Sequence, residues 1–188
     1  MQLIFGGNSD IAKQLLGVRL LRQQCDVTNF AQVQREIDRF EPTEIVHCAG
    51  VIHPDLIKNS NPLDWIEEIK VNLISSYYVA KANAKNKGKM VFIGSTSGLR
   101  GRGMWSGYSA SKAGLISLVQ SLGDEGYDAW CLNISRTDTK MRSRLFSNED
   151  KSTLMTPVYV ASVVEDCFKG KYPTGSSIIV KKDFIGIQ

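Results

Sequence analysis

Short apolar runs alternate along the chain with longer segments in which apolar residues recur every three or four positions. The short runs are typical of buried strands and predict six of them, at 3–5, 18–21, 44–49, 90–93, 129–134 and 177–180. The longer segments predict helices over 9–16, 30–40, 63–84, 108–122 and 158–168. Ser9 is a suitable N-cap for the first helix, and Gly17 is a suitable residue to follow its end.

The order of these elements predicts the fold class. Strands that alternate with helices of about ten residues or more form βαβ units, which produce a parallel sheet. We therefore predict one α/β domain over residues 1–188, with a doubly wound, Rossmann-like sheet of about six strands and helices on both faces. The helix over 63–84 is expected to pack through an apolar stripe formed by Trp65, Ile66, Ile69, Leu73, Tyr77 and Ala80.

Composition excludes several classes of protein. The hydrophobic share of 43% and the charged share of 22% are ordinary values for a globular domain. A net charge of +4 without a run of like charges argues against a nucleic-acid binder. No signal peptide is visible and no apolar run approaches the roughly 20 residues of a membrane span, so we expect a cytoplasmic protein. The dispersed cysteines predict buried free thiols, and we expect no metal site.

The first predicted strand leads into a glycine-containing loop with the sequence Gly6-Gly7-Asn8-Ser9-Asp10-Ile11-Ala12. Ligands of open α/β sheets bind at the carboxyl ends of the strands, and glycines there allow backbone to approach a pyrophosphate. The amides that open the next helix would attract its charge. A tight strand–helix turn explains the two glycines equally well. Asp10 would stand near the phosphates, cap the helix or face solvent.

Two charged residues follow the second predicted strand. Asp26 is placed to accept hydrogen bonds from adenine or ribose. Arg22 is placed either to bind a 2′-phosphate, which would favour NADP over NAD, or to remain an ordinary surface arginine.

The strongest chemical signal is Tyr108-Ser-Ala-Ser-Lys112 within a predicted helix, where residues four apart share one face. A phenol has a pKa near 10, and a nearby ammonium together with an oxidised nicotinamide would lower that pKa. Such a pair suits proton transfer to or from a carbonyl oxygen. Ser95, thirteen residues earlier, can hydrogen-bond the same oxygen. Asn72 is either a satisfied buried amide or part of a relay that holds water near Lys112.

Several motifs in this order resemble the short-chain dehydrogenase/reductase family over essentially the whole chain. They are the glycine loop, Cys25-Asp26-Val27-Thr28, His47-Cys48-Ala49-Gly50, Val71-Asn72-Leu73, the Ser95 segment, Tyr108–Lys112 and Arg136-Thr137-Asp138-Thr139. The resemblance implies catalytic roles for Ser95, Tyr108, Lys112 and Asn72. It implies a cofactor site formed by Gly6, Asn8, Ser9, Asp10, Ile11, Arg22, Asp26, Val27, Ala49, Gly50, Tyr108, Lys112 and Thr139. The sequence departs from the family where Asn-Asn becomes His47-Cys48 and where Pro-Gly becomes Ile134-Ser135.

A closer similarity suggests the substrate. The segments around Arg102 and Arg136 resemble the reductase domain of bifunctional ribitol-5-phosphate cytidylyltransferases, which implies reduction of ribulose 5-phosphate with NADPH. Both arginines then bind substrate together with Ser95, because guanidinium suits a phosphate monoester. Alternatively, they are solvated charges or ion-pair partners of the Glu149 and Asp150 region. The polar segment 140–151 is typical of a substrate lid.

The leading hypothesis is an NAD(P)(H)-dependent oxidoreductase that interconverts a carbonyl and an alcohol on a small sugar or polyol, with or without a phosphate. The alternatives are a catalytically silent dinucleotide-binding sensor and a sugar-nucleotide epimerase or dehydratase. The family resemblance also implies a homodimer or homotetramer formed through helices 63–84 and 108–122. Candidate contacts there are Tyr77, Tyr78, Leu115, Leu118 and Leu122, with packing in the core as the alternative.

Overall fold

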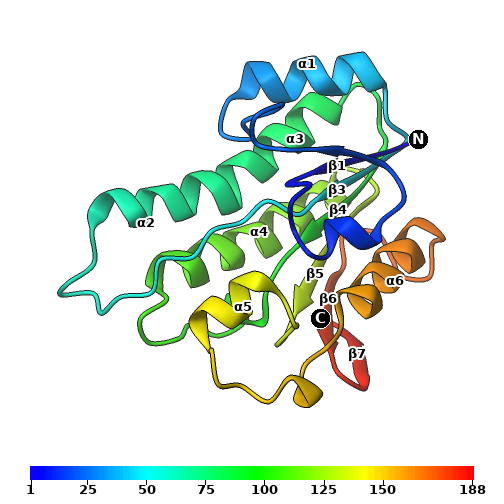
Figure 1. The fold of residues 1–188 in the computed structure, drawn as a ribbon. Helices are drawn as coiled ribbons and strands as arrows, with labels where there is room; N and C mark the ends of the chain where they lie inside the picture. Colours follow the sequence, from blue (N-terminus) through cyan, green and yellow to red (C-terminus); the bar gives the residue numbers. More distant parts are fainter.

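Six parallel strands and one antiparallel strand form a single sheet in the computed structural model, which describes residues 1–188 (Figure 1). The strands are β1 (Gln2–Phe5), β2 (Val18–Leu20), β3 (Glu44–His47), β4 (Lys89–Ile93), β5 (Ala129–Ile134), β6 (Ser177–Lys181) and β7 (Phe184–Ile187). Their spatial order is β2-β1-β3-β4-β5-β6-β7. After β1 the chain forms β2 on one side of that strand and then β3 on its other side, so the direction of strand order reverses at β1. The carboxyl ends of β1 and β3 therefore flank the point where ligands bind in such sheets.

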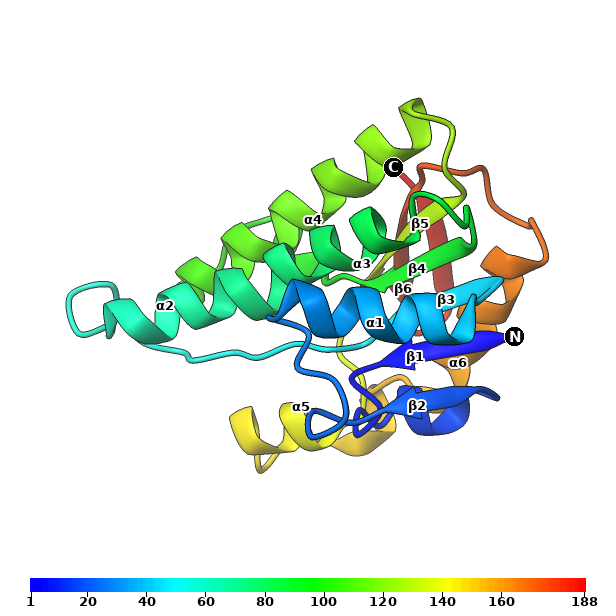
Figure 2. The same ribbon diagram turned by 90° about the horizontal axis from the view of Figure 1, so that it is seen from above.

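Helices cover both faces of the sheet, as predicted. On one face lie α1 (Phe30–Phe40), α3 (Ser75–Asn83) and α4 (Ser106–Asp124), and on the other lies α6 (Pro157–Phe168) (Figures 1 and 2). Successive side chains of a strand point to opposite faces, so Leu3 and Phe5 join one buried cluster while Ile4 joins the other. The predicted doubly wound α/β domain is confirmed in this respect.

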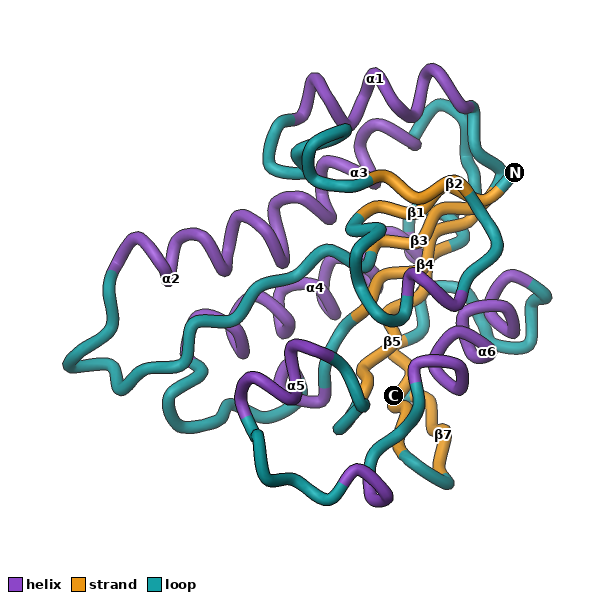
Figure 3. Tube along the Cα trace, in the orientation of Figure 1, coloured by secondary structure: helices purple, strands orange, loops and turns teal.

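The long helix predicted over 63–84 contains a local change of winding. It consists of α2 (Pro62–Ile69), a π-helical turn η2 (Lys70–Ile74) and α3, and α2 extends away from the sheet (Figures 1 and 3). The predicted apolar stripe is wrong over this first half. Trp65 and Ile66 are 37% and 42% exposed, whereas Glu68 is 2% exposed and Asn72 is 1% exposed. The reason is that this half of the helix packs on α4 and on a loop instead of on the apolar sheet.

The helix predicted over 9–16 is also wrong. Only a three-residue 3-10 turn, η1 (Ala12–Gln14), forms there, and Leu15 already has extended backbone angles. The physical reason is length, because residues 6–17 alone connect two strands that pair directly in parallel. Since no helix ends there, Gly17 does not have the predicted role. A Cβ on Gly17 would lie 2.6 Å from the carbonyl oxygen of Gln2, so glycine permits close approach to β1.

The carboxyl-terminal part adds a strand that the sequence did not reveal. β7 pairs antiparallel with β6 through a tight turn in which Asp183 has a φ of 64°. The third strand ends at His47, two residues earlier than predicted. The segment 140–151, predicted as a lid, contains the short helix α5 (Lys140–Leu145), and η4 (Lys151–Thr153) starts at its end; a further 3-10 turn, η3 (Thr96–Gly98), follows β4.

The residues suggested for subunit contact divide between the core and the surface. Leu115 and Leu122 are buried in the core, Tyr78 and Leu118 pack against it, and Tyr77 is 50% exposed. The core alternative therefore holds for both buried leucines. None of the helices combines the length and the apolarity that crossing a membrane would require.

Ile37 tests the packing of α1 on the sheet. The side chain is fully buried among the residues of the first core cluster. We expect Ile37→Ala to lower the free energy of unfolding by about 3 kcal/mol, because it removes buried methyl groups and leaves a cavity. Urea denaturation measures this change. Asp38→Ala, at the adjacent exposed position, should stay within about 0.5 kcal/mol of the wild type; equal losses would contradict the assigned packing.

Candidate active site

A cleft of about 630 Å³ opens at the carboxyl ends of the strands that flank the reversal in strand order. Its size falls within the range of small-molecule and cofactor sites. Every residue predicted to bind the cofactor lines this cleft, namely Gly6, Asn8, Ser9, Asp10, Ile11, Arg22, Asp26, Val27, Ala49, Gly50, Tyr108, Lys112 and Thr139. The structure therefore brings together residues from segments far apart in the sequence.

Two glycines give the cleft its shape. Gly6 has a φ of +75°, and a Cβ there would lie 2.7 Å from the Cα of Ala49, so only glycine allows the loops after β1 and β3 to touch. A Cβ on Gly50 would stand 3.4 Å from Oδ1 of Asn72 and 3.9 Å from Nζ of Lys112. Both distances are ordinary van der Waals contacts, and Gly50 and Lys112 both line the cleft. These features fit an extended dinucleotide.

The charge of the cleft comes mainly from side chains. Because η1 has only three residues, the predicted helix amides are largely absent from the phosphate loop. Basic residues that the sequence reasoning did not single out line the cleft in addition to Arg22 and Lys112, namely Lys13, Lys140 and Arg144. The acidic residues in the lining are Asp10 and Asp26. The lining is therefore positive overall, as an anionic ligand requires.

The carboxylate of Asp10 bridges two distant segments. Its Oδ2 accepts a hydrogen bond of 2.7 Å from the backbone N–H of Lys140, the first residue of α5. Lys13 lies 3.7 Å away from the other carboxylate oxygen. Of the alternatives left open by the sequence, helix capping is the one found, although the capped helix is α5. This contact ties the glycine loop to the segment 140–151.

Asp26 and Arg22 stand together in the cleft. Oδ1 of Asp26 accepts hydrogen bonds from the hydroxyl and the backbone N–H of Thr28, at 2.7 and 2.9 Å. These bonds, with the charge of Arg22, lower the pKa of Asp26, so the carboxylate is ionised at neutral pH. Arg22 is exposed within the cleft lining.

Tyr108 and Lys112 line the cleft, and Ser95, which lies outside the cleft lining, is close to Tyr108. Lys112 is 4% exposed, and its Nζ donates a 2.7 Å hydrogen bond to the carbonyl oxygen of Ile93 at the end of β4. The same Nζ lies 5.7 Å from the centroid of the Tyr108 ring. Burial lowers the pKa of Lys112 to about 8. Ser95 is buried, and its hydroxyl acts on the pKa of Tyr108 as a hydrogen-bond partner.

The direction of the Tyr108 shift differs from the prediction. Burial raises the pKa of this phenol, the hydrogen bond from Ser95 lowers it, and the charge of Glu68 raises it further. The protein alone thus favours the neutral phenol. The reason is that the Lys112 ammonium is held by the Ile93 carbonyl oxygen and not by the phenol oxygen.

Asn72 joins two segments of the site. Its Oδ1 accepts from the N–H of Val51 at 2.8 Å, and its Nδ2 donates to the oxygen of Val51 at 2.9 Å and to Oγ of Ser111 at 3.1 Å. The Ser111 hydroxyl in turn donates to the carbonyl oxygen of Tyr108 at 2.7 Å. The side chain is therefore a satisfied buried amide, and the water-holding relay stays a prediction.

His47 supports the π-helical turn that carries Asn72. The imidazole lies edge-on between Phe5 and Phe92, and its Nε2 is 2.6 Å from Oγ of Ser75. Because the Ser75 hydroxyl donates to the carbonyl oxygen of Val71 at 2.6 Å, Nε2 is the donor to Ser75. Burial lowers the pKa of His47 to about 3, so the ring is neutral. His47 therefore fixes the turn without carrying charge.

An aromatic wall continues from Tyr108 toward α5, and sequence reasoning missed it. The ring of Trp105 lies 5.9 Å from that of Tyr108 and 6.2 Å from that of Phe146. Two guanidinium groups stack on this wall, Arg102 at 5.5 Å from the Trp105 ring and Arg142 at 3.8 Å from the Phe146 ring. The sequence contained one signal for the contact between Trp105 and Tyr108, because Trp105 stands about one helical turn before Tyr108.

Arg136 takes part in an ion-pair network beside this wall. Nη1 of Arg136 lies 3.6 Å from a carboxylate oxygen of Glu149. The same carboxylate accepts two hydrogen bonds of 2.6 Å from Arg142. These contacts lower the pKa of Glu149, with the Arg142 hydrogen bonds as the largest cause. The ion-pair alternative for Arg136 is the arrangement found, and neither Arg102 nor Arg136 lines the cleft.

The chain is similar in sequence to several oxidoreductases. It is 30% identical over 122 residues to an uncharacterized oxidoreductase, YciK, of Escherichia coli, covering 60% of this chain and 48% of that protein. It is 32% identical over 134 residues to a mouse 3-oxoacyl-[acyl-carrier-protein] reductase, covering 65% of this chain and 57% of that protein. The chain spans about half the length of these curated relatives.

The fold is shared with solved structures. A short chain dehydrogenase from Shigella flexneri, complexed with NADP, superimposes with a TM-score of 0.79 at 20% identity, covering 93% of each chain. A family model described as short chain dehydrogenase matches residues 8–150, which is most of the sequence. The chain therefore belongs to the short-chain dehydrogenase family.

Proposed function

We propose that the protein is an NADP(H)-dependent oxidoreductase that interconverts a carbonyl group and an alcohol. The observation that carries the proposal is that Tyr108 and Lys112 line one cleft and that the Ser95 hydroxyl lies close enough to act on the Tyr108 phenol. A binding protein without chemistry has no need for a phenol, a hydroxyl and a buried ammonium at one place.

The roles follow from the geometry. A bound nicotinamide cofactor supplies or accepts the hydride. Tyr108, whose pKa the protein raises, is protonated at neutral pH and therefore suits donation of a proton to the carbonyl oxygen in the direction of reduction. The hydroxyl of Ser95 hydrogen-bonds the same oxygen, and the Lys112 ammonium, which lines the cleft, suits contact with the bound cofactor. Asn72 holds the helix and the loop that place these groups.

The cleft favours NADP over NAD. Arg22 is exposed beside Asp26 at the position where a 2′-phosphate of the adenosine ribose would lie. Lys13 adds a second cation to the lining. The complex of the Shigella relative with NADP supports this choice.

We propose a small substrate, with a phosphorylated sugar or polyol as the finer assignment. Arg102 and Arg136, both near the wall beside Tyr108, suit a phosphate, which would compete with Glu149 for its guanidinium partners. The likeness to ribitol-5-phosphate cytidylyltransferase reductase domains rests on these segments alone, and the relatives described above do not add to it. A homo-oligomer stays a proposal, supported by the exposed Tyr77 on α3.

A dinucleotide-binding sensor is the second candidate, because one observation favours it. The helix that normally follows the glycine loop is reduced to η1, which removes part of the fixed phosphate site. Cofactor binding without turnover toward any small carbonyl compound would select the sensor. An epimerase or dehydratase, which keeps its cofactor through turnover, would release a tightly held dinucleotide on denaturation.

Tyr108→Phe tests the proposed proton donor. We expect turnover to fall by roughly 100-fold or more, because general acid catalysis typically contributes that factor. Absorbance of NADPH is followed with a panel of small ketones and ketose phosphates. NADPH affinity should stay within about twofold of the wild type, since the ring remains. Tyr77→Phe, on an exposed ring of α3, is the matched control, and turnover that survives Tyr108→Phe would refute the mechanism.

Arg22→Ala tests the choice of cofactor. We expect NADPH to bind about tenfold more weakly, because a charge-assisted contact to the 2′-phosphate is lost, while NADH affinity changes little. Fluorescence titration of each reduced cofactor gives the two dissociation constants. Arg19→Ala removes an equal charge from β2 outside the cleft lining and should spare both cofactors. Equal losses for NADPH and NADH would contradict the assignment.

Lys112→Met tests whether the site keeps a buried charge at the expense of stability. The folded pKa is about 8, whereas an unfolded lysine titrates near 10.4. Between these values the unfolded chain binds more protons, so wild-type stability rises with pH. The free energy of unfolding of the variant minus that of the wild type should therefore fall by about 3 kcal/mol as pH rises through this window.

Urea denaturation from pH 5 to 10.5 measures this difference, and its constancy below pH 7 is the internal control. The free energies are compared as differences so that titrations common to both proteins cancel. A difference that stays flat through the window would show that the amine is not desolvated in the folded state.

A further inference from the structure

Helix α4, which carries Tyr108 and Lys112, begins without a cap of its own. The N-cap residue is Trp105, whose side chain makes no capping hydrogen bond, and the first turn contains no acidic residue. Three backbone N–H groups precede the first intrahelical bond, which runs from Ser109 to Trp105 at 2.8 Å. Such groups require partners from elsewhere when they are buried. The last of them belongs to Tyr108.

Glu68 of α2 lies against this first turn. Its carboxylate is 2% exposed and accepts a hydrogen bond of 2.7 Å from the backbone N–H of His53. Burial raises the pKa of Glu68, and the backbone N–H groups of His53 and Tyr108 lower it. A Cβ on Gly107 would overlap Oε2 of Glu68, so the glycine makes room for the carboxylate at this turn. One buried anion thus joins α2, α4 and the loop after β3.

A carboxylate at this place also acts on chemistry. Negative charge is favourable at a helix N-terminus, which compensates part of the cost of burying it. The same charge disfavours ionisation of the neighbouring phenol and helps to keep Tyr108 protonated. Asn72 lies one turn further along the same helix and binds Val51 and Ser111, so two polar residues of one helix face hold the reacting segment.

We propose that Glu68 is a positioning residue, which caps helix α4 from outside and fixes both the place of the Tyr108 phenol and the charge beside it. This inference rests on the proposed role of Tyr108. Because Glu68 itself does not line the cleft, whereas Tyr108 does, it acts through the tyrosine.

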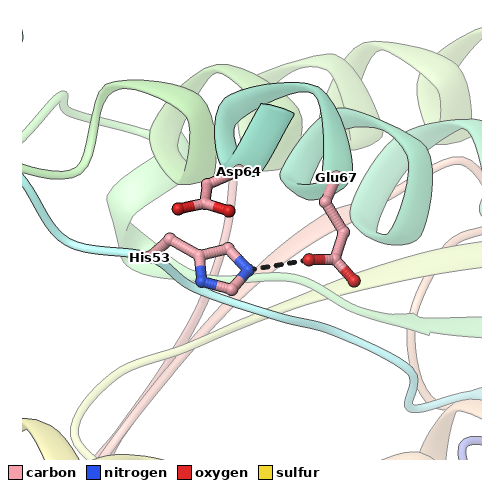
Figure 4. Close-up of side chains that lie close together, drawn as sticks. All are labelled: His53, Asp64 and Glu67. Atoms are coloured by element: carbon pink, nitrogen blue, oxygen red, sulfur yellow. Dashed lines mark hydrogen bonds and ion pairs between the residues drawn. The ribbon is translucent and has the colours of Figure 1, made fainter. Parts of the chain in front are cut away.

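Other charged groups surround Glu68 and need to be separated from it. His53 and Asp55 come from the loop after β3, and Asp64 lies one turn earlier on α2; all three line a hollow of about 320 Å³ together with Glu68. The carboxylate of Glu67 faces the ring of His53 and lies 3.1 Å from its Nε2 (Figure 4). Glu67 has the same charge, lies on the same helix and is not among the groups that shift the pKa of Tyr108, so it offers a control.

The experiment follows the ionisation of Tyr108 directly. Protein labelled with 3-fluorotyrosine is titrated by fluorine NMR, and the Tyr108 signal is assigned by its loss in Tyr108→Phe. The fluorine lowers the pKa of the phenol, which brings its titration into a range where the folded protein can be measured. We expect Glu68→Gln to lower the Tyr108 midpoint by about one pH unit, since a like charge is removed. Glu67→Gln should leave the midpoint unchanged.

Gly107→Ala displaces the same carboxylate from the other side and should lower the midpoint in the same direction. Circular dichroism shows whether Glu68→Gln folds. If that variant does not fold, the Tyr108 midpoint of Gly107→Ala tests the proposal. An unchanged midpoint in the folded variants, or an equal shift in Glu67→Gln, would overturn the proposal. The titration needs neither cofactor nor substrate, so a wild-type protein without turnover would refute the proposed function and still leave this result readable.

Discussion

The buried ammonium of Lys112 is the constraint on which the rest of the site depends. A charge at 4% exposure with one carbonyl partner is costly, and the fold accommodates it only through close backbone approaches. Gly98 is one of them, because a Cβ there would lie 2.7 Å from the carbonyl carbon of Lys112. The arrangement of strand ends around α4 therefore serves the amine first.

The second feature is a polar buried face on a helix that the pattern predicted to be apolar. Glu68, Asn72 and Ser75 all point inward from the α2–η2–α3 helix, because its first half meets α4 and the loop after β3 instead of the sheet. The π-helical turn shifts the face by one residue so that Asn72 reaches both Val51 and Ser111. Such turns often occur at functional sites. Apolar packing would be more stable here, but it would not hold the hydrogen bonds that place the reacting helix.

Local pattern predicted most of the fold. The first six strands, α1 and α4 are found close to their predicted places, because periodicity and strand length are properties of neighbouring residues. The convergence of Tyr108, Lys112 and Ser95 also followed from spacing and order. The predicted helix after the glycine loop was wrong because its length depends on the distance between two paired strands, and no local pattern contains that distance. The same holds for β7, whose pairing with β6 became visible only in the folded sheet.

The residues that sequence reasoning missed act across long separations. The contact of Asp10 with Lys140, 130 positions away, is one such case, whereas Arg142 binds Glu149 only seven positions further along the chain. Glu68 resembled an ordinary helix-surface acid, since nothing in the sequence shows that α4 begins without a cap. Each of them is a polar residue in a segment expected to be apolar or irregular. The sequence does not show which residue each of them contacts.

The shortened first connection has a consequence for how the cleft attracts an anion. A full helix would present fixed amides to a pyrophosphate, whereas η1 is too short to do so, and Asp10 turns its carboxylate to α5 instead. Positive charge comes from the side chains of Lys13, Lys140 and Arg144. Exposed side-chain charges are screened by salt far more than buried dipoles. Part of the positive charge that would attract an anion therefore belongs to the segment 140–151, through Lys140 and Arg144.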